Sequence, residues 1–158
     1  GKTLPFQSEM FDSVLCTEVF EHIFNLEEIL NEINRVMKHG GKMIVTCPFV
    51  WNEHEVPHDF ARYTRFALES ILKKAGFEVV EYSKSGDFIS TITQLITLYF
   101  FNAFKGWWRK VFIFRWIYKA LFFLIPNLTG IILQRILPNN DSLYLNNILV
   151  ARKIANVA

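Results

Sequence analysis

The fold is decided by residues Phe11–Pro48, FDSVLCTEVFEHIFNLEEILNEINRVMKHGGKMIVTCP. The first six of them, Phe11–Cys16, form a short apolar run of the kind that is buried in a parallel sheet. Glu18, Glu21 and His22 come next, so titratable groups gather where this predicted strand ends. In open α/β sheets, ligands bind at the carboxyl ends of the strands. The position of these side chains therefore makes them candidates for a functional site.

A helix and a second strand are predicted within the same stretch. Asn25 with Glu28 three residues later is a capping-box pattern. The helix that follows has one apolar face at helical spacing, made of Leu26, Ile29, Leu30, Ile33, Val36 and Met37. Gly40-Gly41 is expected to end this helix, and Lys42–Cys47 to form the second strand. A strand, a covering helix and a strand in this length predict a right-handed crossover unit.

The remaining elements of the predicted sheet lie on either side of an unusual segment. Thr64 is expected to cap a second helix that ends at Gly76, and Phe77–Tyr82 to form a third strand. Leu143–Lys153 is the fourth predicted strand. The chain therefore divides into an α/β part, residues 1–87 and 139–158, and a helical, hydrophobic insertion, residues 88–138.

Charge is distributed unevenly between these parts, although the net charge is only +2. Residues 1–87 hold nine Lys and Arg against 14 Asp and Glu, a net charge of −5. Residues 88–158 hold eight basic residues and one acid, a net charge of +7. The asymmetry indicates two surfaces with different partners. The only two cysteines, Cys16 and Cys47, both lie in predicted core strands, which favours reduced thiols and a cytoplasmic location.

The insertion has the composition of a segment that lies at a membrane surface. It contains no acid, three tryptophans, and six basic residues: Lys105, Arg109, Lys110, Arg115, Lys119 and Arg135. Its uncharged stretches, residues 88–104 and 120–134, are shorter than the roughly 20 apolar residues of a spanning helix. Interleaved tryptophans and bases predict peripheral contact with an anionic bilayer. A lid on its own domain or an interface between two copies remains the alternative. A nucleic-acid reader is not expected, because the bases lie in an apolar segment.

Several stretches together resemble a known family. They are FDSVLCTEVFEH, EILNEINRVMKHGGKMIVTCP, PFVWNEHEVPHDFARYTRFALESILKKAGFEVVE and LYLNNILVARK, about two-thirds of the chain. In this order they resemble the second half of a class I S-adenosylmethionine-dependent methyltransferase, in the group that includes the ubiquinone and menaquinone biosynthesis enzymes. The resemblance implies a Rossmann-like half-sheet of family strand order 4-5-7-6. The last strand would be antiparallel and inserted between the second and third, with the first strand at an edge.

The resemblance also implies features that the sequence does not contain. The family binds the methionine end of its cofactor with a glycine-rich turn and the ribose with an acid after the next strand. None of the seven glycines forms a G-x-G-x-x-G turn. We therefore expect this chain to correspond to the carboxyl-terminal half of such an enzyme, and to bind S-adenosylmethionine weakly or not at all by itself.

Candidate site residues fall in two places. The resemblance implies that S-adenosylmethionine is the cofactor and that the turn after the first strand lies beside its methionine and sulfonium. The expected cofactor-binding residues are Leu4, Cys16, Thr17, Glu18 and His22. The loop after the second strand is rich in aromatic and titratable residues, and its strand-end location predicts contact with the methyl acceptor. The expected acceptor-binding residues are Trp51, Glu53, His54, His58, Asp59, Arg62 and Tyr63.

Three histidines are the candidates for proton transfer: His22, His54 and His58. The simpler alternatives are that Glu21 and His22 cap and solvate a turn, and that the loop is a solvated connector in which Arg62 pairs with Glu53 or Glu55. His54, His58 and Asp59 are metal-ligand types, but their H-x-x-x-H-D spacing lies in a loop and not on one helical face, so no metal site is predicted.

Two functions of different classes follow from the sequence. The first is S-adenosylmethionine-dependent methyl transfer to a small or lipid-linked acceptor. The second is a non-catalytic module, derived from a methyltransferase, that associates with a membrane or forms an oligomer. The sequence does not identify the acceptor atom, because positioning supplies much of the rate in methyl transfer and no fixed base is required.

Overall fold

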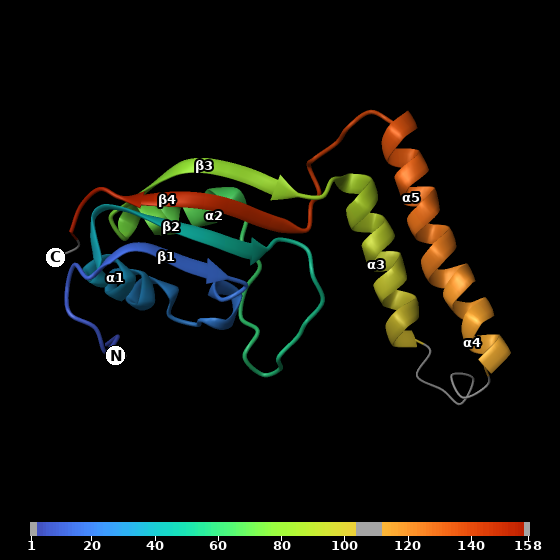
Figure 1. Ribbon diagram of the computed structural model, residues 1–158, viewed down its shortest axis with the longest axis horizontal. Coiled ribbons are helices and arrows are strands. Elements are labelled where there is room, and N and C mark those ends of the chain that lie inside the picture. The colour runs from blue at the N-terminus through green and yellow to red at the C-terminus, as the bar shows by residue number, and fades with distance from the viewer. Residues whose placement is uncertain (1–2, 104–111, 157–158) are drawn as a thin grey trace. The chain divides into compact units, whose positions relative to one another are not determined.

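The computed structural model describes residues 3–103 and 112–156, and these form two compact units (Figure 1). The first unit holds the residues up to Ser85 and those from Leu145 onward, and the second runs from Gly86 to Tyr144. These bounds lie within a few residues of the division expected from the sequence. The expected tryptophans Trp107 and Trp108 and three of the six bases of the insertion lie outside the described residues.

The first unit is built on a four-stranded mixed sheet of order β1-β2-β4-β3. Its strands are β1 (Phe11–Thr17), β2 (Met37–Pro48), β3 (Phe77–Ser85) and β4 (Asn146–Lys153). β1 and β2 pair in parallel, whereas β4 is antiparallel to both β2 and β3. The last strand thus lies between the second and third, where the resemblance placed it, and β1 is an edge strand of the described sheet.

One face of this sheet carries the core. The short 3-10 helix η1 (Phe20–His22) and the helices α1 (Leu26–Val36) and α2 (Arg65–Lys74) supply the side chains that pack against this face. Buried side chains alternate along β2 and β4, and the resulting core consists of Phe20, Leu26, Leu30, Ile33, Met37, Met43, Val45, Cys47, Leu68, Leu72, Ala75, Phe77, Leu149 and Ala151. Side chains on the opposite face are more exposed: Leu15 is 68% and Ile44 45% exposed.

The glycine pair does not end the first helix, so that prediction is wrong. α1 ends at Val36, and Met37 already has extended backbone angles and begins β2. Gly40 and Gly41 lie inside the strand, where the register against β1 shifts between Phe11 and Ser13. A Cβ on Gly41 would lie 3.0 Å from the Asp12 carbonyl oxygen. The glycines therefore lie in an irregular part of β2 that passes close to β1.

The other predicted boundaries have mixed outcomes. The capping box at Asn25 is wrong, because its side chain makes no cap and instead donates to Glu28 Oε1 at 3.2 Å. The cap at Thr64 is confirmed, since its Oγ1 accepts from the Ala67 backbone N–H at 3.2 Å. Gly76, with a φ of +77°, follows the end of α2 as expected. β4 begins at Asn146, three residues later than predicted.

The second unit consists of helices. α3 spans Phe88–Ala103, and α4 (Phe112–Lys119), the π-helical segment η3 (Ala120–Leu124) and α5 (Ile125–Ile136) follow one another without a break. α3 packs against α5 and η3. The segment predicted to be helical, residues 88–138, is therefore helical over 88–103 and 112–136.

A buried lysine ties the end of the sheet to the end of α1. Lys153 is only 1% exposed, and its Nζ donates to the backbone oxygens of Asn34 and Met37, each at 2.8 Å. The Asn34 side chain in turn donates to the carbonyl oxygens of Ala75 and Ala155, each at 2.9 Å. A cation at a helix carboxyl end also interacts favourably with the helix dipole.

Replacing this lysine should destabilise the first unit. Lys153→Met removes the charge and leaves two buried carbonyls without their donor, so we expect the free energy of unfolding to fall by on the order of 2–3 kcal/mol. Chemical denaturation followed by circular dichroism measures it. Lys42→Met is the control, because Lys42 is exposed on β2. Equal losses in the two variants would show that the Lys153 contacts do not stabilise the fold.

Candidate functional site

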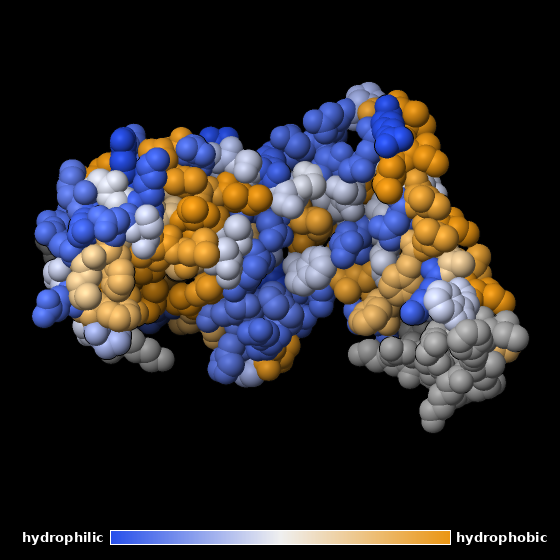
Figure 2. All heavy atoms as spheres, in the orientation of Figure 1, coloured by the Kyte–Doolittle hydropathy of each residue, from blue (hydrophilic) through white to orange (hydrophobic). Residues whose placement is uncertain are grey.

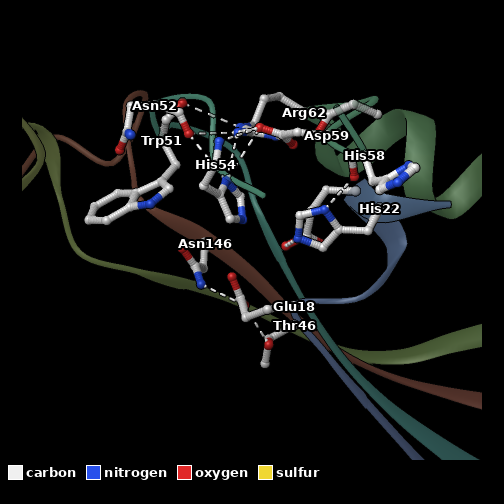
Figure 3. A network of polar contacts seen from close by, with 12 residues as sticks. Glu18, His22, Thr46, Trp51, Asn52, His54, His58, Asp59, Arg62 and Asn146 are labelled. Carbon is white, nitrogen blue, oxygen red and sulfur yellow. Dashed lines mark hydrogen bonds and ion pairs between the residues drawn. The ribbon is translucent and has the colours of Figure 1, made fainter. Parts of the chain in front are cut away.

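Glu18 is held at the edge of the sheet where β1 and β2 end and β4 begins. It follows β1 with a φ of +52°, a left-handed conformation that is uncommon for residues other than glycine and clusters at functional sites. Its backbone N–H donates to the Thr46 carbonyl oxygen at 2.9 Å. Its Oε1 accepts from Thr46 Oγ1 at 2.6 Å and from Asn146 Nδ2 at 2.8 Å (Figure 3). Side chains of β2 and β4 thus hold the carboxylate at the carboxyl end of β1.

This carboxylate faces a pocket of about 500 Å³. The pocket is lined by Glu18, His22, Trp51, His54, Glu55, Ser85, Leu145 and Asn146. A second pocket of about 490 Å³ is lined by His22, Ile23, Phe24, Asn25, Glu28, Ile29, His58 and Phe60. His22 borders both, so the turn after β1 and the loop after β2 together form the walls.

An arginine–aspartate pair organises the loop after β2. Arg62 donates to both carboxylate oxygens of Asp59, at 2.6 and 2.7 Å, and to the backbone oxygens of Trp51, Asn52 and Ala61. Asp59 also accepts from the His54 backbone N–H at 3.0 Å. Hydrogen bonds from Arg62, then the His54 N–H, hold the pKa of Asp59 well below its usual range. The expected pairing of Arg62 with Glu53 or Glu55 is wrong, because Asp59 offers a bidentate partner three residues away.

Glu21 lies in a different environment from Glu18. Its side chain is fully buried, and neither carboxylate oxygen has a hydrogen-bond partner among the described residues. Burial raises the pKa of Glu21, and the charge of Glu18 adds to the effect, while His22 and His54 oppose it. Cys47 is buried nearby, and burial followed by the charges of Glu21 and Glu18 raises the pKa of its thiol. The alternative of Glu21 as a solvated turn residue is therefore wrong.

Four of the expected site residues come together around one pocket: Glu18, His22, Trp51 and His54. His58 lines the neighbouring pocket, and its carbonyl oxygen lies 2.6 Å from His22 Nδ1. Thr17 is exposed at the end of β1, next to Glu18.

The remaining expected residues lie elsewhere. Leu4 lines a separate apolar cavity with Phe6 and Phe11, and Cys16 packs against the core, where burial raises its pKa. Asp59 and Arg62 are engaged within the loop. Tyr63 packs against the core, and Glu53 lines none of these pockets. Only part of the predicted loop therefore faces the pockets.

Sequence reasoning missed Thr46, Asn146 and the burial of Glu21. Thr46 could have been found, because it is the partner of Thr17 in a parallel pairing of the two predicted strands. Asn146 opens β4, and only the insertion of β4 beside β2 brings it to Glu18. No local pattern distinguishes a buried Glu21 from an exposed one.

Comparison with known proteins agrees with this fold. A methyltransferase domain family model matches residues 1–45. An uncharacterised protein of Methanocaldococcus jannaschii is 33% identical over 116 residues, which cover 68% of this chain and 48% of that protein. The mitochondrial ubiquinone biosynthesis O-methyltransferase of Rattus norvegicus is 28% identical over 125 residues, 68% of this chain and 32% of the enzyme. The chain thus spans half or less of the length of these relatives.

Among solved structures, a SAM-dependent methyltransferase from Archaeoglobus fulgidus superposes with a TM-score of 0.51 at 18% identity. The match covers 94% of this chain and 62% of that protein, so it concerns the fold. The family matched by residues 1–45, the named relative and this structural neighbour are all methyltransferases. The chain is therefore similar to methyltransferases and has the Rossmann-like α/β fold of S-adenosylmethionine-dependent ones.

Proposed function

We propose that this chain takes part in S-adenosylmethionine-dependent methyl transfer to a small or lipid-linked acceptor. One observation carries the proposal: a carboxylate, Glu18, is held by Thr46 and Asn146 at the edge of a pocket that two histidines and a tryptophan also line. A fixed anion beside a concave, partly aromatic surface suits a cationic cofactor such as a sulfonium.

The residues would then have distinct roles. Thr17, Glu18 and His22 lie on the side of the cofactor, whose methionine carries positive charge on its amino group and sulfur. Trp51 and His54 lie on the side of the acceptor, and His22, His54 and His58 are the available proton acceptors. Methyl transfer needs the acceptor atom in line with the sulfonium methyl, so positioning by this loop supplies the acceleration.

The role of Glu18 is open to direct test. In the full-length protein, Glu18→Gln should weaken S-adenosylmethionine binding about tenfold, which is a loss of about 1.4 kcal/mol of binding free energy. Isothermal titration calorimetry measures it, with Glu69→Gln as the control because Glu69 pairs with Arg65 on the surface of α2. If the unaltered protein gives no heat of binding, the methyl-transfer proposal fails and the non-catalytic module is favoured.

The helical unit supports contact with a lipid bilayer. The helix Trp116–Ile136 has 21 residues and a mean hydropathy of 1.6, and only 6% of its apolar window is buried. At 1.5 Å per residue it is about 31 Å long, close to the roughly 30 Å of a bilayer core. The sequence-based expectation that no stretch is long enough to span a bilayer counted only the residues between charged ones. The helix is longer because it includes Lys119 and Arg135 near its ends.

The contacts between α3 and the helix Trp116–Ile136 also support this proposal of bilayer contact. Thr93 lies against Gly130, and a Cβ on Gly130 would lie 2.6 Å from the Thr93 hydroxyl oxygen. The side-chain amide of Gln134 donates to Asp87 Oδ1 at 2.9 Å. The Tyr118 hydroxyl donates to the Phe100 carbonyl oxygen. Small and polar groups therefore face one another, as in helix pairs within lipid. Figure 2 shows apolar side chains over α5. The exposed Leu and Ile side chains of η3 and α5 are Leu121, Leu124, Ile125, Leu128, Ile131, Ile132 and Ile136.

We therefore propose that the unit from Gly86 to Tyr144 inserts its apolar surface into an anionic membrane, which would bring a lipid-linked acceptor to the enzyme. This surface is also the observation that favours the second candidate function, a non-catalytic membrane module. Basic residues near an anionic surface contribute on the order of 1 kcal/mol each. The contact would be partly electrostatic and partly apolar.

Co-sedimentation with vesicles tests the membrane contact. The protein should bind vesicles containing phosphatidylserine more tightly than neutral phosphatidylcholine vesicles, and salt should remove only the electrostatic share. Leu128→Glu should weaken binding about 30-fold, because a charge on a lipid-facing site costs on the order of 2 kcal/mol or more. Phe66→Glu is the control, an exposed apolar residue of α2.

If the protein ignores both kinds of vesicle and instead forms a dimer that Leu128→Glu dissociates, the apolar surface is an interface between two copies. The membrane proposal would then be wrong, and the methyl-transfer proposal would be unaffected.

A further inference from the structure

The buried carboxylate of Glu21 lacks the partners that such a group requires. It is 0% exposed, and its oxygens are without hydrogen bonds in the described part of the chain. A buried acceptor without a partner costs on the order of 1–3 kcal/mol, and a charged one costs more. The Cys47 thiol is close enough for Glu21 to raise its pKa, but a thiol is only a weak donor and does not satisfy the carboxylate. The position therefore favours either a proton on the carboxyl or a cation bound to it.

Two histidines converge on this carboxylate. One possible ligand atom each of Glu21, His22 and His54 lies within 4.8 Å of the other two. His22 Nε2 is 3.8 Å from Glu21 Oε1, and the rings of His22 and His54 meet edge to face with centroids 4.7 Å apart. Figure 3 shows these two rings near Glu18, and both border the 500 Å³ pocket.

The outer contact of His22 leaves its Nε2 available for a metal. His22 Nδ1 lies 2.6 Å from the His58 carbonyl oxygen, an acceptor that requires a proton on Nδ1. A proton on Nδ1 places the lone pair on Nε2. The His54 ring is held at Nδ1 by two acceptors, the Asn52 carbonyl oxygen at 3.2 Å and Asp59 Oδ2 at 3.3 Å, and by one donor, Arg62 Nη2 at 3.3 Å. Metal-bound histidines are oriented in this way, by a carbonyl or a carboxylate on the other ring nitrogen.

The donor set and its surroundings indicate the class of metal. Two imidazoles and one carboxylate are the ligands of catalytic zinc sites, in which the fourth position holds water or substrate. Magnesium and calcium prefer sets of oxygen ligands, so they suit this site less. Ligand atoms of a tetrahedral zinc lie roughly 3.3 Å apart, so a bound ion would draw the three groups together. His22 and His54 have exposed side-chain fractions of 17% and 28%, so their rings have room to move.

We propose that Glu21, His22 and His54 bind a zinc-class divalent cation whose open position faces the pocket beside Glu18. His54, His58 and Asp59, from which no metal site was predicted, are a different set: Asp59 pairs with Arg62 and contacts His54, while the His58 carbonyl oxygen contacts His22. The site therefore joins the turn after β1 to the loop after β2.

The use of the ion rests on the proposed methyl transfer. A hydroxyl bound at the open position would lose its proton more readily, because the cation stabilises the oxygen anion. The proton would leave to water or a neighbouring base. The oxygen would then bond to the methyl carbon while the carbon–sulfur bond breaks, and its electron pair would stay on sulfur as a neutral thioether. The inference assigns the acceptor to the class of phenols or alcohols.

Cobalt(II) and zinc chloride are the probes for this site. After dialysis against a chelator, the protein should take up one equivalent of Co²⁺ with visible absorption bands, and Zn²⁺ should displace it. Glu21→Gln and His54→Gln should each weaken binding by more than about 100-fold, because loss of an outer contact alone costs 10–100-fold. His39→Gln is the control, since His39 contacts the Ile154 carbonyl oxygen on the surface. Thermal unfolding verifies that the variants are folded.

Affinity should also rise with pH. Burial raises the pKa of Glu21, and a proton on this carboxyl competes with the metal. The charged and titratable groups that face Glu21 are Glu18, His22, His54, Arg62, Cys47 and Tyr63. No uptake by the unaltered protein, or uptake that survives Glu21→Gln and His54→Gln, would overturn the proposal. Metal binding without S-adenosylmethionine binding would leave the site standing and reject only its use in methyl transfer.

Discussion

The parallel pairing of β1 with β2 is the constraint on which the site depends. Thr17 lies opposite Thr46, and the backbone N–H of Glu18 makes the next hydrogen bond to β2. Because the strands are parallel, both chain exits leave the sheet at the same edge. The turn with Glu21 and His22 therefore meets the loop with His54 and His58. An antiparallel pair would have sent these two segments to opposite ends of the sheet.

The sequence predicted the elements better than their ends. Apolar runs and helical spacing identify the strands and helices of the first unit because burial on one face determines both patterns. The boundary between α1 and β2 was wrong because Gly40-Gly41 resembles a helix stop. The structure gives each glycine its own reason: Gly40 has a φ of +78°, and a Cβ on Gly41 would meet the carbonyl oxygens of Lys38 and Asp12. Similarly, Asn25 has the right neighbours for a cap, but its side chain bonds to Glu28 instead.

Prediction of the site from sequence reached the segments but not the contacts. Strand-end position identified Glu18, His22 and the loop from Trp51 to Tyr63, because that rule follows from topology. Which loop residues face the pocket depends on the Arg62–Asp59 pair, and its partners are set by three-dimensional geometry. Asn146 is 128 residues from Glu18 in the chain, so no local pattern could have joined them.

Glu18 and Glu21 show how one short motif gives two chemically different carboxylates. They are three residues apart, but Glu18 is exposed and accepts hydrogen bonds from Thr46 and Asn146, whereas Glu21 is buried without such partners. The first needs no ligand, because Thr46 and Asn146 donate to it and it is open to water. The second must bind a proton or a cation, since a buried carboxylate alone is costly. Environments that separate two titratable groups in this way are how one site divides its chemical roles.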